Sequence, residues 1–364
     1  MQIVLLRPLC QEADKRRRLY DVLVKSLNNV PIQIVETAEE FETTDLKNKK
    51  IIFAISLGES GVNLAWYEIL KAIRLNPGCM EGSIGAVIVD GNSELYTKDA
   101  ARHLVFSSNA SGCTFIGKPL VEGTKELINY NILAKNLEST NQEAYEAQGE
   151  DLIKRLQEFS LPAKKNPKLL VIHAGIYGKS NSLALWEMVK KELEATVEIK
   201  EISLRNGEIF DCIGCPYNTC LHYGEKNSCF YGGIIVEEVY PAIIECDGLM
   251  MVCANYNDAL AANMSAFINR MTAPFRANDF SDKMLFSIVV SGYSGGDLVA
   301  QQLISGINMN KSFILPSPFA LLETANNPGS ILKVPGIQEK ASAFGRQMEM
   351  YLTKGINKEV PNAV

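Results

Sequence analysis

Short apolar runs alternate along this chain with segments of helical periodicity. The runs at 3–6, 86–89 and 169–172 are apolar throughout, as in parallel strands that are buried on both faces. The segments 51–73 and 248–271 each begin with such a run, pass through a polar loop and continue with an amphipathic helical pattern. Regular alternation of strand and helix predicts βαβ units in a doubly wound parallel α/β sheet.

The same pattern occurs twice. Each half holds five strand–helix units, so we expect two tandem domains of one fold, over residues 1–160 and 168–364, that arose by duplication. The connector at 160–168 contains Pro and Lys, as exposed linkers do. The segments that align in order and at nearly constant offsets are 30–41 with 197–210, 86–91 with 288–293, 113–117 with 311–315, and the closing helices 142–159 with 338–352.

The alignment of the two halves is interrupted at one place. Between Phe210 and Asp247 the second half carries a long stretch that has no counterpart in the first half. A Cys-x2-Cys pair with two further cysteines nearby can supply four thiolates to a metal. This predicted insertion, 211–246, holds four of the nine cysteines, namely Cys212, Cys215, Cys220 and Cys229.

Charge and composition narrow the class of protein. A net charge of −6 and a pI near 5.4 argue against a general binder of nucleic acid. We expect no secretion signal and no membrane span, because no apolar stretch approaches the roughly 20 residues that cross a bilayer. Nine cysteines without a secretion signal indicate a reducing cytoplasm, where clustered cysteines bind metal or carry out redox chemistry.

Polar loops follow three predicted strands of the second half. The first loop leads into a predicted helix start, where hydroxyls and free backbone N–H groups suit a phosphate. Glycines in the third loop let the backbone approach a planar ligand. Each loop alone is also explained by capping or turn chemistry, but ligands of doubly wound sheets bind at the carboxyl ends of strands. The candidate binding residues are Ser180, Asn181 and Ser182, then Asn255, Tyr256 and Asn257, then Ser291, Gly292, Tyr293, Ser294 and Gly295.

The first half lacks these loops. Its corresponding segments are 7–18, 56–62 and 90–96, and the first of them has a basic run in place of Ser-Asn-Ser. We therefore expect the first half to be a degenerate copy with a structural or dimerising role.

With these loops in place, residues 168–355 resemble the flavodoxin-like NAD(P)H-dependent FMN reductases and the iron–sulfur flavoproteins. Ser180-Asn181-Ser182 stands where that group has Gly-Asn-Thr around the FMN phosphate. Ala254-Asn255-Tyr256-Asn257 stands where it has Pro-x-Tyr against the flavin ring, and Ser291–Gly296 lies at its glycine-rich loop. Phe267-Ile268-Asn269-Arg270 is close to the end of its next helix.

The resemblance implies two flavodoxin-like domains, of which the second binds FMN. NAD(P)H or ferredoxin would be the electron donor, and a quinone, flavin, nitro compound or metal would be the acceptor. Because the flavin carries the redox chemistry, no side chain is assigned as catalytic. Arg270 is expected to pair with a carboxylate or to form a pocket wall, and His173 to be a hydrogen-bonded core residue. The first half could replace a dimer partner, so a pseudo-dimeric monomer or a homodimer is expected.

Three functions are open for the whole chain. Our prediction is an FMN-dependent NAD(P)H oxidoreductase in the cytoplasm. One alternative is an iron–sulfur flavoprotein that takes electrons from ferredoxin, with a [4Fe–4S] cluster on the four cysteines; the gap from Cys215 to Cys220 is longer than in that family. The other alternative is a non-redox assembly module that holds a structural zinc, with His222 as an optional ligand. Free thiols without any metal are also compatible with the spacing.

Overall fold

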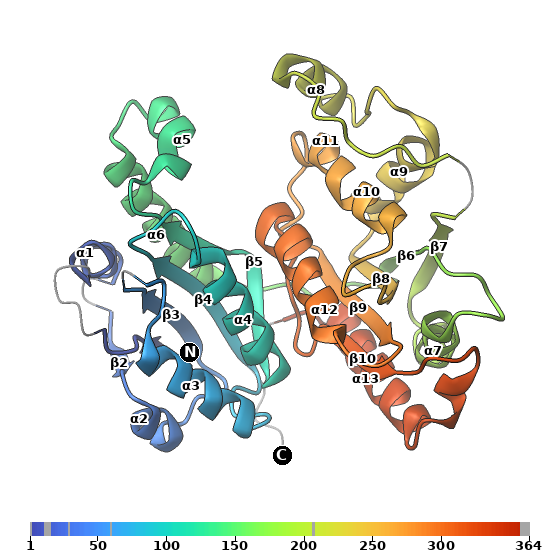
Figure 1. Ribbon diagram of the computed structural model, residues 1–364, viewed down its shortest axis with the longest axis horizontal. Helices are drawn as coiled ribbons and strands as arrows, with labels where there is room; N and C mark the ends of the chain where they lie inside the picture. The colour runs from blue at the N-terminus through green and yellow to red at the C-terminus, as the bar shows by residue number, and fades with distance from the viewer. Residues whose placement is uncertain (1, 11–15, 28–29, 59, 206–207, 357–364) are drawn as a thin grey trace. The chain divides into compact units, whose positions relative to one another are not determined.

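The computed structural model of this chain describes residues 2–10, 16–27, 30–58, 60–205 and 208–356. The chain forms two compact units, the first ending at Phe159 and the second beginning at Ser160. Each unit contains one five-stranded parallel sheet with helices on both faces (Figure 1). The predicted fold class, two tandem doubly wound α/β domains, is confirmed.

The sheet of the first unit has the strand order β2-β1-β3-β4-β5, which is the flavodoxin-like order. The strands are β1 (Ile3–Leu6), β2 (Ile32–Val35), β3 (Lys50–Ser56), β4 (Ser83–Asp90) and β5 (Cys113–Gly123). The helices are α1 (Arg16–Ser26), α2 (Ala38–Thr43), α3 (Leu64–Leu75), α4 (Thr97–Ala110), the 3-10 turn η2 (Ile128–Tyr130), α5 (Asn131–Asn136) and α6 (Asn141–Glu158).

The sheet of the second unit has the same order read from the other edge, β10-β9-β8-β6-β7. The strands are β6 (Lys168–His173), β7 (Glu198–Ser203), β8 (Gly248–Ala254), β9 (Met284–Ser291) and β10 (Ala320–Thr324). The helices are α7 (Asn181–Lys190), α8 (Tyr217–Gly224), η3 (Ile235–Val239), α9 (Tyr240–Glu245), α10 (Ala262–Arg270), α11 (Thr272–Phe275), α12 (Gly296–Leu303), η4 (Ile304–Met309), η5 (Ser330–Lys333) and α13 (Ile337–Lys354).

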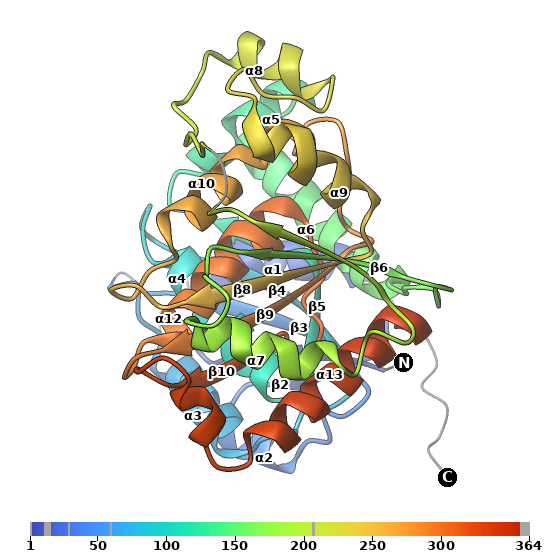
Figure 2. The same cartoon turned by 90° about the vertical axis from the view of Figure 1, so that its right-hand side faces the viewer.

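The central strands form the core of each unit. Every residue of β3, β4 and β9 is buried, because helices cover both faces of each sheet. Figure 2 shows α7 and α13 in front of one face of the second sheet. Among the described helices, none combines the length and the apolarity that crossing a bilayer requires.

The fifth strand is interrupted in the same way in both units. In the first unit the pairing moves from Gly85 with Phe115 to Val87 with Leu120, and in the second from Met284 with Ile314 to Ser287 with Ala320. The interruption therefore has the same length in both. It also corrects the sequence alignment: Cys113 pairs with the first residue of β4 and Ile314 with the first of β9, so 113–117 matches a segment that begins at 314 rather than 311. An apolar run on its own does not reveal where such a bulge lies.

The cysteine-rich segment lies in a connection that is longer in the second unit than in the first. In the first unit, β2 ends at Val35 and β3 begins at Lys50, whereas in the second unit the chain runs from Ser203 to Gly248 between the equivalent strands. This longer connection carries α8, η3 and α9, where the first unit has α2 alone, and α8 packs against α11. The second unit is thus the common fold with one added lobe.

Candidate functional site

An open cleft of about 320 Å³ lies at the carboxyl ends of β6, β8, β9 and β10. These four strands are neighbours in the second sheet, so the loops that follow them meet at one edge. The predicted binding residues that line the cleft are Ser180, Asn181, Ser182, Asn255, Tyr256 and Gly292. The others, Asn257, Ser291, Tyr293, Ser294 and Gly295, lie in the same loops but outside the lining.

One end of the cleft is the start of α7. Ser180 is the N-cap: its Oγ accepts a hydrogen bond from the Leu183 N–H at 3.3 Å and lies 2.9 Å from Ser182 Oγ. The first N–H groups of a helix have no intrahelical acceptor, and they carry the positive end of the helix dipole. Lys179 adds a cation beside them. This end of the cleft suits a phosphate.

Asn181 has a different role from the two serines. Its buried side chain donates from Nδ2 to the carbonyl oxygens of Ala325 at 3.0 Å and Asn327 at 2.9 Å. Its Oδ1 accepts from the Ile331 N–H at 3.4 Å. The side chain is therefore committed to the loop after β10, and any contact with a ligand would come from the backbone of Asn181.

The loop after β8 is organised by Asn255. Its Nδ2 lies within hydrogen-bonding distance of Asp258 Oδ1, Ser291 Oγ and the Ser294 carbonyl, at 3.2, 3.3 and 2.8 Å. Its buried Oδ1 has no hydrogen-bond partner among the described residues. Since a buried acceptor without a donor is costly, this oxygen suits an N–H group of a bound molecule. The ring of Tyr256 is 52% exposed beside it.

The loop after β9 presents backbone to the cleft at Gly292 and braces the neighbouring loop with its other residues. Tyr293 is 81% exposed, and its hydroxyl accepts a hydrogen bond from Asn326 Nδ2 at 2.9 Å. Gly295 has φ +79, and a Cβ there would collide with Asp258 Oδ1, so only glycine fits between the two loops. Asn257, with φ +52, sits at the tip of a tight turn.

Among the lining residues that the sequence reasoning missed are Lys179, Arg205, Ala325 and Asn326. Arg205 follows β7, and Ala325 and Asn326 follow β10. Applying the strand-end rule to these two strands as well would have found them, but the fifth strand was placed too early. Lys179 and Arg205 give the cleft two cations, and its described lining has no carboxylate, although the chain as a whole carries a net charge of −6. The cleft is thus suited to an anion.

A second cavity of about 460 Å³ adjoins the cleft and shares Arg205 and Tyr256 with it. Its remaining wall is formed by Ala174 and the segment 260–263, which is mostly small and apolar. A planar molecule bound in the cleft would therefore have room beside it for a second, mainly apolar ligand.

A partly exposed polar cluster supports the loop before α7. Glu201 on β7 accepts hydrogen bonds from Tyr177 in this loop, from Trp186 Nε1 at 3.2 Å and from Lys190, whose Nζ is 3.0 Å away. Burial opposes ionisation of Glu201, but these donors outweigh it and lower its pKa. His173 is buried, as predicted, but its Nδ1 has no partner among the described residues, and burial lowers its pKa.

Residues 167–327 match the family model of the NADPH-dependent FMN reductases. This match confirms the resemblance that the motifs of the second half predicted. It covers the three predicted loops, the insertion and the first residues after β10. No curated protein matches the chain.

Solved structures with the flavodoxin-like fold align with about half of this chain. The NAD(P)H:quinone oxidoreductase from Methanothermobacter marburgensis is 15% identical, over 51% of this chain and 97% of that protein, with a TM-score of 0.38. The FMN-dependent NADH-azoreductase from Bacillus anthracis, solved with FMN, is 12% identical over 52% and 100%, with a TM-score of 0.35. The Trp repressor binding protein from Bacillus subtilis is 20% identical over 48% and 95%, with a TM-score of 0.32.

The four cysteines of the insertion line one small cavity in this FMN-reductase-like unit. The cavity has a volume of about 40 Å³, and Tyr223, Phe230 and Arg270 are also part of its wall. Within the described ranges, no three His, Cys, Asp or Glu side chains converge closely enough to hold a metal ion. The insertion therefore brings its four thiols around a common space without forming a ready site for one ion.

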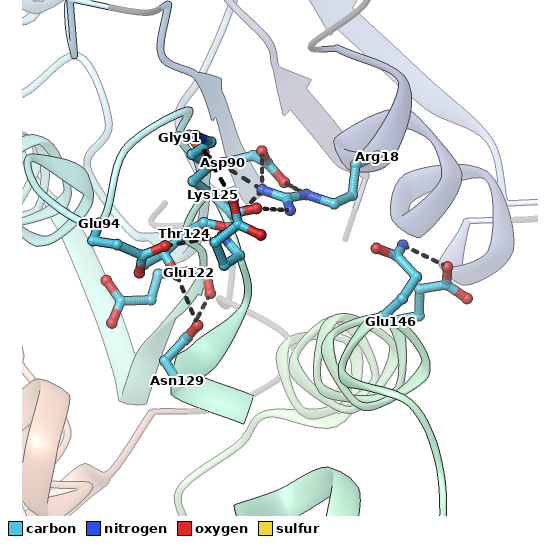
Figure 3. A network of polar contacts seen from close by, with 11 residues as sticks. Arg18, Asp90, Gly91, Glu94, Glu122, Thr124, Lys125, Asn129 and Glu146 are labelled. Atoms are coloured by element: carbon cyan, nitrogen blue, oxygen red, sulfur yellow. Dashed lines mark hydrogen bonds and ion pairs between the residues drawn. The ribbon is translucent and has the colours of Figure 1, made fainter. Parts of the chain in front are cut away.

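At the equivalent edge of the first unit, one side chain bridges the first helix, the end of the fourth strand and the loop after the fifth strand. Arg18 on α1 donates to both carboxylate oxygens of Asp90, at the end of β4, at 2.8 Å each, and to the Thr124 carbonyl at 2.9 Å (Figure 3). Burial raises the pKa of Asp90 despite this guanidinium. Thr124 directly follows β5 as Ala325 directly follows β10, so Arg18 ties the first helix to the last loop as Asn181 does in the second unit.

Proposed function

We propose that the protein is an FMN-dependent NAD(P)H oxidoreductase that reduces a small acceptor of the quinone, flavin or nitro-compound class. The observation that carries the proposal is the cationic cleft at the carboxyl edge of the second sheet, within the segment that matches the FMN reductases. When bound, FMN supplies the redox chemistry by accepting a hydride from NAD(P)H and passing electrons to the acceptor. The protein binds and orients it.

The residues of the cleft fit FMN from end to end. The start of α7, with Ser180, Ser182 and Lys179, would hold the phosphate. The unpartnered Oδ1 of Asn255 would accept a hydrogen bond from a ring N–H, and the exposed ring of Tyr256 would contact the flavin plane or edge. The cavity on the far side of Arg205 and Tyr256 would receive the nicotinamide or the acceptor.

The phosphate end of this site is tested by a double variant, Ser180→Ala with Ser182→Ala. Loss of hydrogen bonds to a charged group costs about 1.5–3 kcal/mol, so FMN affinity, measured by fluorescence titration, should fall roughly 10- to 100-fold. Thr140→Ala, which removes the N-cap of α6 in the first unit, is the matched control and should leave the affinity unchanged. Equal FMN affinity in the double variant and wild type would show that the phosphate lies elsewhere.

The electron donor is tested by anaerobic reduction. The FMN-loaded protein is mixed with NADH, with NADPH or with reduced ferredoxin, and bleaching of the flavin absorption is followed. Rapid bleaching by a pyridine nucleotide supports the oxidoreductase. Bleaching by ferredoxin alone would instead favour an electron carrier.

A specific observation favours a second candidate, an iron–sulfur flavoprotein. The four cysteines line one cavity, and four cysteine thiolates are the usual ligand set of a [4Fe–4S] cluster. Cys212, Cys215, Cys220 and Cys229 would be its ligands. Iron, sulfide and zinc analysis of protein purified without oxygen tests this candidate. Iron and sulfide would support the cluster, and zinc would support the assembly module. If no metal is found, the flavin is the redox group.

A further inference from the structure

Arg270 is a buried cation without a carboxylate partner. It is the last residue of α10, and it is only 2% exposed. The guanidinium forms no ion pair with any described residue; the nearby carboxylate of Asp211 accepts instead from Asn269 Nδ2 at 2.9 Å. A buried charge costs several kcal/mol unless an opposite charge compensates it. The expected counter-charge has to come from another group.

The hydrogen bonds of Arg270 hold the two ends of the cysteine segment. Its Nη1 donates to the Phe210 carbonyl at 3.3 Å and its Nη2 to the Gly232 carbonyl at 2.8 Å. Phe210 precedes the first cysteine and Gly232 follows the last. The backbone of Arg270 is fixed in turn, because the Tyr240 hydroxyl donates to its carbonyl at 2.6 Å.

One edge of the guanidinium forms no hydrogen bond with a described residue. Its Nε is buried and has no hydrogen-bond partner among the described residues. Arg270 lines the same cavity as Cys212, Cys215, Cys220 and Cys229. Four thiolates around an iron–sulfur core would supply the negative charge that the guanidinium lacks.

We propose that Arg270 is the positioning residue and counter-charge of an iron–sulfur site on the four cysteines; this rests on the second candidate of the proposed function. In a water-poor cavity a positive charge favours the more negative, reduced state of such a site. Arg270 therefore raises the reduction potential of the site as well as tethering the loop that forms it.

The test compares wild type with Arg270→Gln, Arg270→Lys and Arg276→Gln after anaerobic reconstitution with ferrous iron and sulfide. Arg276 is the matched control, because it is exposed and lies over the Tyr217 ring at 4.7 Å, next to the insertion but outside the cavity. Iron and sulfide per chain, the reduction potential from an EPR-monitored titration, and FMN affinity are measured for each protein.

We expect R270Q to retain FMN and to bind less iron, and the cluster that it does bind should have a more negative potential. R270K should restore most of the potential, and R276Q should behave as wild type. If R270Q loses iron but the reduction potential does not change, or if lysine does not restore the potential, Arg270 has only a structural role and the proposal is wrong. If wild type itself takes up no iron, the cluster candidate fails, and the inference fails with it. Wild-type uptake with an unaffected R270Q refutes the inference alone.

Discussion

At the scale of single residues, the cleft depends on side chains that hold its walls as much as on those that face a ligand. Asn181 stands in the middle of the Ser-Asn-Ser motif, yet its carboxamide donates hydrogen bonds to the carbonyls of Ala325 and Asn327. Those carbonyls belong to the loop that supplies Ala325 and Asn326 to the lining. The motif therefore combines two serines that line the cleft with one structural amide.

Replacing Asn181 with Ala should lower both stability and FMN affinity. One buried and one partly buried carbonyl lose their donor, which costs about 1–3 kcal/mol in the free energy of unfolding, and the loosened loop weakens the cleft. Urea unfolding and FMN titration measure the two effects. Asn63→Ala is the control, since Asn63 is a buried helix-start asparagine of the first unit; it should cost stability only. An N181A protein with normal stability would contradict a structural role for the Asn181 side chain.

His173 should make the unliganded protein less stable in mild acid. Burial lowers its pKa below the ordinary value of 6.5, although the Glu201 charge acts in the opposite direction. The unfolded chain therefore binds a proton first, and the free energy of unfolding should fall as the pH drops below about 6.5. Glu201, whose pKa is lowered, loses its stabilising charge only below its ordinary value of 4.5, in a separate window.

Urea unfolding at pH 7.5 and pH 5.5 tests this prediction. His173→Gln should lose less stability over that interval than wild type does. His222→Gln replaces an exposed histidine of the insertion and should keep the wild-type dependence. The prediction is wrong if H173Q and wild type lose the same amount.

At the scale of elements, a glycine lies where the closing helix of each unit crosses the first helix. A Cβ at Gly149 of α6 would collide with Val22 of α1, and one at Gly345 of α13 would come within 2.8 Å of the Val189 carbonyl on α7. The sequence showed both glycines, but the crossing that requires them is a tertiary contact. The close approach lets both helices cover the same face of each sheet.

Gly345→Ala should therefore destabilise the protein despite the better helix propensity of alanine. Propensity favours alanine by about 1 kcal/mol, whereas overpacking against a backbone carbonyl that cannot move costs about 1–3 kcal/mol. The reverse change at an exposed site of α13, Ala343→Gly, is the control and should cost about 1 kcal/mol from propensity alone. A thermal melt in which G345A is more stable than wild type would exclude the close crossing.

At the scale of the whole molecule, two units share one topology, and the described residues of the second form an open, cationic cleft at its sheet edge. At the corresponding edge of the first unit, Arg18 pairs with Asp90. The common strand order and the matching break in the fifth strand agree with duplication, which stays a prediction. We expect the second unit to bind the flavin and the first unit to have a role in structure or assembly.

The protein should accordingly bind one FMN per chain, measured by release of flavin from a known amount of protein. Arg18→Gln should leave that ratio and the FMN affinity unchanged. It should lower the free energy of unfolding by roughly 3 kcal/mol, because it leaves Asp90 buried without its counter-charge. Two FMN molecules per chain, or loss of FMN in R18Q, would contradict this division.

The sequence by itself determined the fold class, its repetition and the position of the insertion, because buried parallel strands and amphipathic helices leave periodic patterns that neighbouring residues define. It also indicated which loops form the cleft, since strand ends are local features. Only the tertiary structure decided which carbonyls Asn181 holds, and that Arg270 lies among the four cysteines with no carboxylate partner among the described residues. These facts depend on contacts between residues far apart in the chain, and no local pattern encodes them.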